Sequence, residues 1–189
     1  MTALWCTWSW RNNKIFNDAR VALMDIIQNI SFLLGSVPKE SPKMKKSNRN
    51  GLPDPLLRPP MAFFDGAAQR NSCGCGVFII ISEHLHYRLA WNAGFGTNSM
   101  AEAMALAGLL PFCIYFDIDS ISSFGDSKLM VDHVNGKCII RCPHLAGWLE
   151  RVMFFWDLMA GSSIQHIYRT RNPVADCLSK QGLLLGTGT

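Results

Sequence analysis

The sequence lacks an apolar run long enough to cross a membrane. The longest nearly uninterrupted run, residues 103–116, has 14 residues and contains Pro111, whereas a transmembrane helix needs about 20. The first ten residues have no basic segment followed by a long apolar one and no cleavage site of small residues, which argues against a secretory signal. These absences predict an intracellular protein, nuclear or cytoplasmic, that has no membrane association.

A regular framework of paired cysteines is also missing. The seven cysteines are odd in number and scattered along the chain, a distribution typical of reduced thiols and not of disulfides. One grouping, Cys138, Cys142 and His144, hints at a soft metal such as zinc. It has no second matching pair, so we favour ordinary core and loop residues over a zinc site.

A strong charge of one sign is the third absence. The net charge of +4 is distributed as +1 in residues 1–37, +4 in residues 38–60 and −1 in residues 61–189. A domain that bound a polyanion by charge alone would be far more basic. Contact with phosphates is therefore expected to rely on the middle segment or on metal ions.

The chain divides into three parts by composition. Residues 1–37 contain apolar positions at helical spacing and predict one or two helices. Residues 38–60 hold six of the nine prolines and six basic residues, which predicts an extended linker. With 49% hydrophobic residues overall, the remaining part, 61–187, is long enough to form one domain with its own core.

Patterns within this third part predict a mixed α/β fold. Strands are expected at 61–64, 73–82 and 87–92, joined by short loops as an antiparallel meander. A capping box, Ser99 to Glu102, starts a helix that Pro111 is expected to end after Leu110. The order is completed by a strand at 118–124, helices at 126–134 and 144–159, a strand at 163–168 and a helix from Pro173, which Asn172 caps. The order β-β-β-α-β-α-α-β-α predicts a five-stranded mixed sheet flanked by helices.

Four acids lie at starts of helices or the end of a strand in this scheme. Asp65 precedes a glycine in a dipeptide common in hairpins, and Glu102 is explained as the third residue of the capping box. Asp126 fits a helix N-cap, and Asp176 fits the first turn of a helix, where the dipole favours an acid. Each structural explanation is sufficient alone. Together, the four carboxylates suggest a site of hard oxygen ligands suited to magnesium.

The motifs that carry these acids resemble those of the ribonuclease H type 1 family, and within it the domain of plant non-LTR retroelement proteins. The resemblance covers about residues 61–184. A weaker one suggests that residues 1–37 are the tail of the zinc-binding segment that follows reverse transcriptase in such elements. The matching motifs are Phe64-Asp65-Gly66-Ala67, Ala101-Glu102-Ala103, Gly125-Asp126-Ser127-Lys128-Leu129 and His166-Ile167-Tyr168-Arg169 followed by Asn172 and Ala175-Asp176.

The resemblance implies an RNase H-like fold and an endonuclease that cuts the RNA strand of an RNA/DNA hybrid with two Mg²⁺ ions, or Mn²⁺ in their place. The residue matching Asp65 would bridge both ions, and that matching Asp176 would hold the ion that activates water. Those matching Glu102 and Asp126 would hold the ion beside the leaving oxygen. His166, ten residues before Asp176, would assist product release, although a histidine within a strand is as often structural. A monomer without known protein partners is expected.

Two departures from the family pattern leave an alternative open, although the four intact acids favour the nuclease. Pro111 interrupts the helix after Glu102, and the strand before Asp126 is rich in serine. Both weaken the scaffold and leave the acids intact. The alternative to a nuclease is therefore an inactive module, a retroelement remnant that binds nucleic acid or a protein partner.

Overall fold

The computed structural model describes residues 60–70 and 72–186. The predicted helical segment 1–37 and almost all of the predicted linker 38–60 lie outside the described residues, so the division into three parts stays a prediction.

A five-stranded mixed sheet forms the centre of the described domain, which confirms the predicted fold class. The strand order is β3-β2-β1-β4-β5. The first three strands along the chain are antiparallel, whereas β1 pairs with β4, and β4 with β5, in parallel. The strands are β1 (Met61–Gln69), β2 (Ser72–Ile80), β3 (His86–Phe95), β4 (Ser122–Gly125) and β5 (Ser163–His166).

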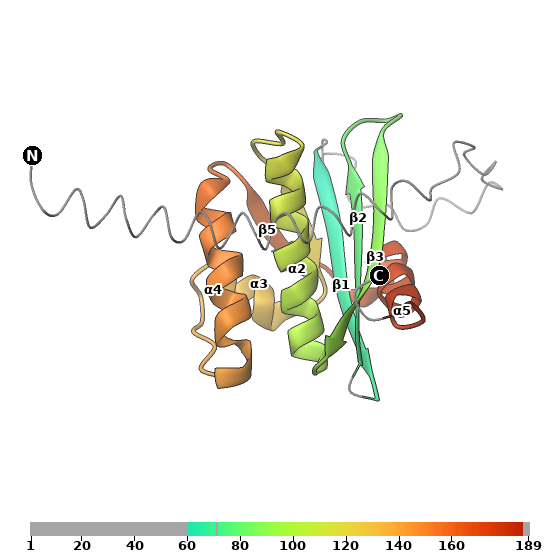
Figure 1. The fold of residues 1–189 in the computed structure, drawn as a ribbon. Coiled ribbons are helices and arrows are strands. Elements are labelled where there is room, and N and C mark those ends of the chain that lie inside the picture. Colours follow the sequence, from blue (N-terminus) through green and yellow to red (C-terminus); the bar gives the residue numbers. More distant parts are fainter. Residues whose placement is uncertain (1–59, 71, 187–189) are drawn as a thin grey trace, which may run out of the picture. The chain divides into compact units, whose positions relative to one another are not determined.

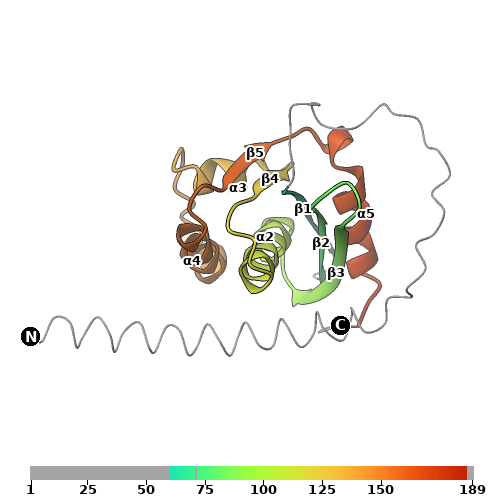
Figure 2. The ribbon, with the colours of Figure 1, turned by 90° about the horizontal axis from the view of Figure 1, so that it is seen from above.

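Helices cover both faces of this sheet. Figures 1 and 2 show α2 and α4 stacked on one face and α5 on the other, with α3 beside β5. The helices of the described part are α2 (Asn98–Tyr115), α3 (Lys128–Val134), α4 (Pro143–Leu158) and α5 (Pro173–Gly182), and a short 3-10 turn, η1 (Arg169–Arg171), precedes α5. None of these helices is both long and apolar enough to span a membrane.

The alternation of side chains along β1 explains why helices cover both faces. Phe63 points toward α5, where it stacks on Phe124 of β4 at 5.2 Å between ring centroids and joins a cluster with Ala175. The neighbouring Phe64 is fully buried, and successive residues of a strand point to opposite faces. A strand that is apolar on both faces needs a layer on each side, and burial of the two phenylalanines stabilises both layers.

The helix after the third strand is longer than the sequence predicted. It begins after Thr97, whose hydroxyl accepts a hydrogen bond from the Met100 amide, and not after Ser99. It also continues through Pro111 to Tyr115, so the expected interruption is wrong. Proline inside a helix costs about 3 kcal/mol. Phe112, buried next to it and packed on Tyr87 at 5.2 Å, offsets that cost because a buried phenylalanine contributes a similar amount.

The first strand is longer as well, and this changes the position of Asp65. We expected the strand to end at Phe64 with a turn at Asp65, but β1 continues to Gln69 and Asp65 pairs with Gly76 in its middle. The hairpin explanation for Asp65 is therefore wrong. The meander fixes this register because both strands are long and buried.

Candidate metal centre

Asp65 lies where the parallel part of the sheet ends. The last pair between β1 and β4 joins Phe64 to Gly125, so β1 continues beyond its neighbour from Asp65 onward. Asp126 directly follows Gly125 and therefore lies at the same notch. Because β1 and β4 are parallel and β4 ends beside the middle of β1, two carboxylates from distant parts of the sequence come together there.

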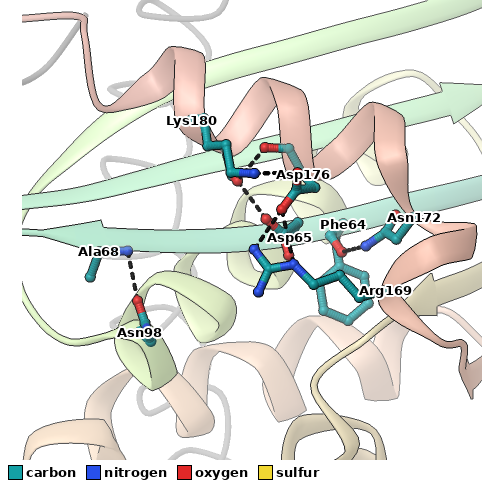
Figure 3. A network of polar contacts seen from close by, with 9 residues as sticks. Phe64, Asp65, Ala68, Asn98, Arg169, Asn172, Asp176 and Lys180 are labelled. Carbon is teal, nitrogen blue, oxygen red and sulfur yellow. Dashed lines mark hydrogen bonds and ion pairs between the residues drawn. The ribbon is translucent and has the colours of Figure 1, made fainter.

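Glu102 reaches the notch because α2 lies against the backbone of β1. A methyl group at Gly66 would overlap the backbone of Ala101 and Glu102, so only glycine permits this approach. The side chain of Asn98 fastens the start of α2 to β1 by accepting a hydrogen bond of 2.7 Å from the Ala68 amide (Figure 3). The first turn of α2 is thereby fixed beside Asp65.

Three of the four predicted acids form one cluster. Carboxylate oxygens of Asp65, Glu102 and Asp126 lie within 4.8 Å of one another. One buried oxygen of Glu102, Oε2, and one of Asp126, Oδ1, have no hydrogen-bond partner. A buried carboxylate oxygen without a partner is costly unless a proton or a cation satisfies it. The cluster therefore has the donor set and the unsatisfied atoms of a site for a hard divalent cation.

The protonation of the cluster reflects this crowding. Burial, followed by the charges of Asp65 and Asp126, raises the pKa of Glu102 to about 9. Burial also raises the pKa of Asp65 to about 6, against the opposing hydrogen bond from Ser179. Without a cation, Glu102 thus stays protonated at neutral pH, whereas a bound cation would favour the charged forms of both carboxyl groups.

The fourth predicted acid, Asp176, is engaged elsewhere. It lies in the first turn of α5, where Arg169 Nη2 and Lys180 Nζ each lie 2.6 Å from one of its carboxylate oxygens (Figure 3). Partial burial opposes ionisation, but hydrogen bonds from Lys180 and Arg169 lower the pKa of Asp176. The structure brings Asp176 near Asp65 without adding it to the three-carboxylate cluster.

Two polar residues, for which the sequence predicted no contact with this site, connect α5 to the cluster. Ser179 donates a short hydrogen bond to Asp65 Oδ2, and its hydroxyl also lies 2.9 Å from the Asp176 carbonyl oxygen. Asn172 occupies the N-cap position of α5, as predicted, but its side chain donates to the Phe64 carbonyl oxygen at 2.9 Å and makes no cap bond. The spacing of Ser179 and Lys180, three and four residues after Asp176, was a signal that they share its helix face. Nothing in the sequence pairs Arg169 with Asp176.

His166 is exposed on β5, opposite Gly125 in the parallel register. Its ring packs edge-on against Tyr168 at 5.8 Å. Within residues 60–70 and 72–186, no metal-ligand group besides the three carboxylates is found. Cys138, Cys142 and His144 do not form such a group.

The arrangement defines the class of the protein. A meander followed by β4 and β5, with carboxylates from β1, α2 and the end of β4 at one notch, is the ribonuclease H fold, and solved structures agree. RNase H1 from the archaeon Halobacterium salinarum is 28% identical, with a TM-score of 0.61 over 65% of this chain and 96% of that one. LC11-RNase H1, isolated from compost and solved with an RNA/DNA hybrid, is 23% identical with a TM-score of 0.60 over 65% and 95%. The foamy viral protease-reverse transcriptase with an RNA/DNA hybrid is 17% identical with a TM-score of 0.53, over 78% of this chain and 23% of that one.

The chain belongs to the reverse transcriptase-like family, whose model matches residues 63–182. This assignment confirms the predicted relationship to ribonuclease H type 1 proteins. No curated protein matches the chain.

Proposed function

We propose that this protein is a metal-dependent endonuclease that hydrolyses the RNA strand of RNA/DNA hybrids. The observation that carries the proposal is the cluster of Asp65, Glu102 and Asp126, which holds two buried oxygen atoms that lack a partner. The ribonuclease H relatives support the substrate class, since LC11-RNase H1 was solved bound to an RNA/DNA hybrid.

The residues present fit Mg²⁺, or Mn²⁺ in its place. Three carboxylates at one notch supply the hard oxygen ligands that these ions prefer. When bound, such ions lower the pKa of an attacking water and stabilise the charge on the leaving oxygen. Asp65, Glu102 and Asp126 would hold the first ion. Asp176 would hold a second one together with Asp65, once it exchanges its contacts with Arg169 and Lys180 for the ion.

Residues around the cluster keep this ligand set in place. Ser179 fixes one oxygen of Asp65 and leaves the other free for a cation. Asn172 ties α5 to the backbone of β1 next to Asp65. Arg169 extends from η1 beside the cluster, where its cation is suited to a substrate phosphate after Asp176 is released. His166 would assist the release of the product.

The ion pairs of Asp176 also favour a second candidate, a module that binds nucleic acid without cutting it. Arg169 and Lys180 already neutralise Asp176 and so compete with a second cation. If they stay in place when the first site is filled, the chain retains one ion and its fold but not two-metal hydrolysis. Monomeric state, intracellular location and origin in a plant retroelement stay predictions.

A cleavage assay separates the two candidates. We expect the full chain to cut the RNA strand of an end-labelled RNA/DNA hybrid in Mg²⁺, leaving 3′-hydroxyl and 5′-phosphate ends, and to leave it intact in chelator. The same labelled RNA annealed to RNA is the control substrate. Binding of the hybrid without any cleavage in Mg²⁺ or Mn²⁺ would support the binding module and contradict the nuclease.

Without metal ions, stability should fall as pH rises. Because the pKa of Glu102 is about 9 in the fold and 4.5 is the ordinary value, the folded state holds a proton that the unfolded state has lost between these values. In this window one such group lowers the free energy of unfolding by at most about 1.4 kcal/mol per pH unit. Thermal melting in chelator from pH 5 to 9 measures the slope. Glu102→Gln should flatten it, and an equal slope in both proteins would show that Glu102 titrates normally.

A further inference from the structure

A largely exposed aromatic ring lies beside the metal centre and has no part in it. Tyr168 is 74% exposed, the most exposed of the three tyrosines, and it is the second residue after the end of β5. Its single ring contact in the described structure is the edge-on packing with His166. A tyrosine that contributes little to the core yet stands in a structured segment offers an open face to a ligand.

The position of Tyr168 is fixed from both sides by the two elements that carry candidate metal ligands. Ile167, which precedes it, donates its amide to the Gly125 carbonyl oxygen at 3.0 Å, and Gly125 adjoins Asp126. Arg169, which follows it, is bonded to Asp176. Neighbouring Cα atoms are about 3.8 Å apart. The backbone of Tyr168 therefore lies one residue away from each of the two residues that make these bonds.

Basic side chains accompany this ring along the edge of the sheet. Lys137 donates its backbone amide to the Asp132 carbonyl oxygen at 2.8 Å, and α3, which carries Lys128 and Asp132, lies beside β5, which carries His166. Lys128 pairs with Asp132 at 2.7 Å yet stays largely exposed, as does Arg169. We call Lys128, Lys137, His166, Tyr168 and Arg169 the Tyr168 strip. Cations around an exposed aromatic ring are the pattern with which proteins bind single-stranded nucleic acid.

We propose that the Tyr168 strip binds unpaired nucleotides that extend the RNA strand beyond the hybrid, with one base stacked on the Tyr168 ring. Bases inside a duplex are stacked on both faces, so only an unpaired or terminal base offers a free face to an exposed ring. Because the proposed function places the RNA strand at the metal centre, that strand continues onto the adjacent strip. This inference rests on the proposed function for the identity of the strand, and it makes the junction between hybrid and single-stranded RNA the preferred substrate.

Binding of short hybrids by the full chain in chelator, followed by fluorescence anisotropy, tests this inference. The hybrid is either blunt or carries a few unpaired RNA nucleotides at its 5′ or its 3′ end. We expect one of the extensions to tighten binding roughly 5- to 100-fold, the range that base–aromatic stacking provides. An extension of the same length made of abasic nucleotides keeps the phosphates, and it should lose most of this gain in affinity.

Variants assign the gain to the ring. Tyr168→Ala should abolish the gain from the extension while changing affinity for the blunt hybrid less than about twofold, and Tyr168→Phe should keep it. Tyr115→Ala is the matched control, because Tyr115 is also exposed, at 52%, but lies at the far end of α2 from Glu102. Unchanged melting temperatures would show that each variant folds.

Two results would overturn the inference: no gain from either extension in the parent protein, or a gain that survives in Tyr168→Ala or with the base-free extension. Cleavage of the blunt hybrid in Mg²⁺ is measured separately. Cleavage without a gain would reject the strip and keep the nuclease, whereas a gain without cleavage would reject the nuclease and keep the strip.

Discussion

Asp65→Asn should lower the rate of hybrid cleavage by roughly a thousandfold or more, because a carboxylate shared by the metal centre supports several kcal/mol of transition-state stabilisation. The fold should tolerate this change. Asp65 is 2% exposed and its bonded oxygen, Oδ2, accepts from Ser179, and the amide oxygen of asparagine can accept the same bond. Removing a charge from a crowded cluster relieves repulsion. In chelator at pH 8, we therefore expect an equal or slightly higher melting temperature.

Magnesium should distinguish the two proteins further. An ion that binds only the folded state at about a hundred times its dissociation constant stabilises by about 2.7 kcal/mol. We expect Mg²⁺ to raise the melting temperature of the parent protein and to have little effect on Asp65→Asn. Paired melting curves with and without Mg²⁺, run beside the cleavage assay, measure this. Undiminished cleavage in the variant, or the same shift in both proteins, would show that Asp65 holds no essential ion.

Gly66→Ala should have the second largest effect, on both stability and activity. The added methyl group would overlap the backbone at Ala101 and Glu102, so α2 must move away from β1. Overpacking of this kind costs about 1–3 kcal/mol. The movement also carries Glu102 away from Asp65, and a displacement of about 1 Å can reduce a rate a hundredfold. Thermal melting and single-turnover cleavage at saturating hybrid measure the two effects.

Gly147→Ala is the matched control for this substitution. Gly147 lies within α4 with nothing within 4 Å of an added methyl group. Alanine in place of glycine inside a helix should raise stability by about 0.5–1 kcal/mol without changing cleavage. If Gly66→Ala behaved like Gly147→Ala, the close contact between β1 and α2 would not be what positions Glu102.

The order of strands and helices could be predicted because it depends on local patterns. The apolar, β-branched run at Val77–Ile81 is a strong signal for a strand, and Asn172 followed by Pro173 is one for the start of the last predicted helix. The predicted ends of helices and strands differ from the structure where tertiary contacts decide them. Pro111 was predicted to end a helix on local grounds, and the burial of Phe112 reversed that outcome. Likewise, pairing with β2 extended β1 through Asp65, against a dipeptide that locally favours a turn.

The grouping of acids was predictable in part for the same reason. Parallel pairing of β1 with β4 brings Asp65 and Asp126 together, and this follows from topology. The partners of Asp176 did not follow, because Arg169 lies in a 3-10 turn whose direction depends on the packing of α5. The contact of Ser179 with Asp65 spans 114 positions, and no local pattern signals a bond over that distance.

The hydrogen bond from Asn172 to Phe64 joins residues that are 108 positions apart. The ribosome therefore makes these two residues at different times. The segment that carries Asp65 leaves the ribosome well before the segment that secures it. At about 5–20 residues per second, the two are separated by roughly 5–20 s. During that interval, the face of β1 that bears Phe63 has no α5 to cover it, and Asp65 has no Ser179 to orient it. The apolar face of β1 therefore stays without this cover, and Asp65 without this partner, until α5 has docked.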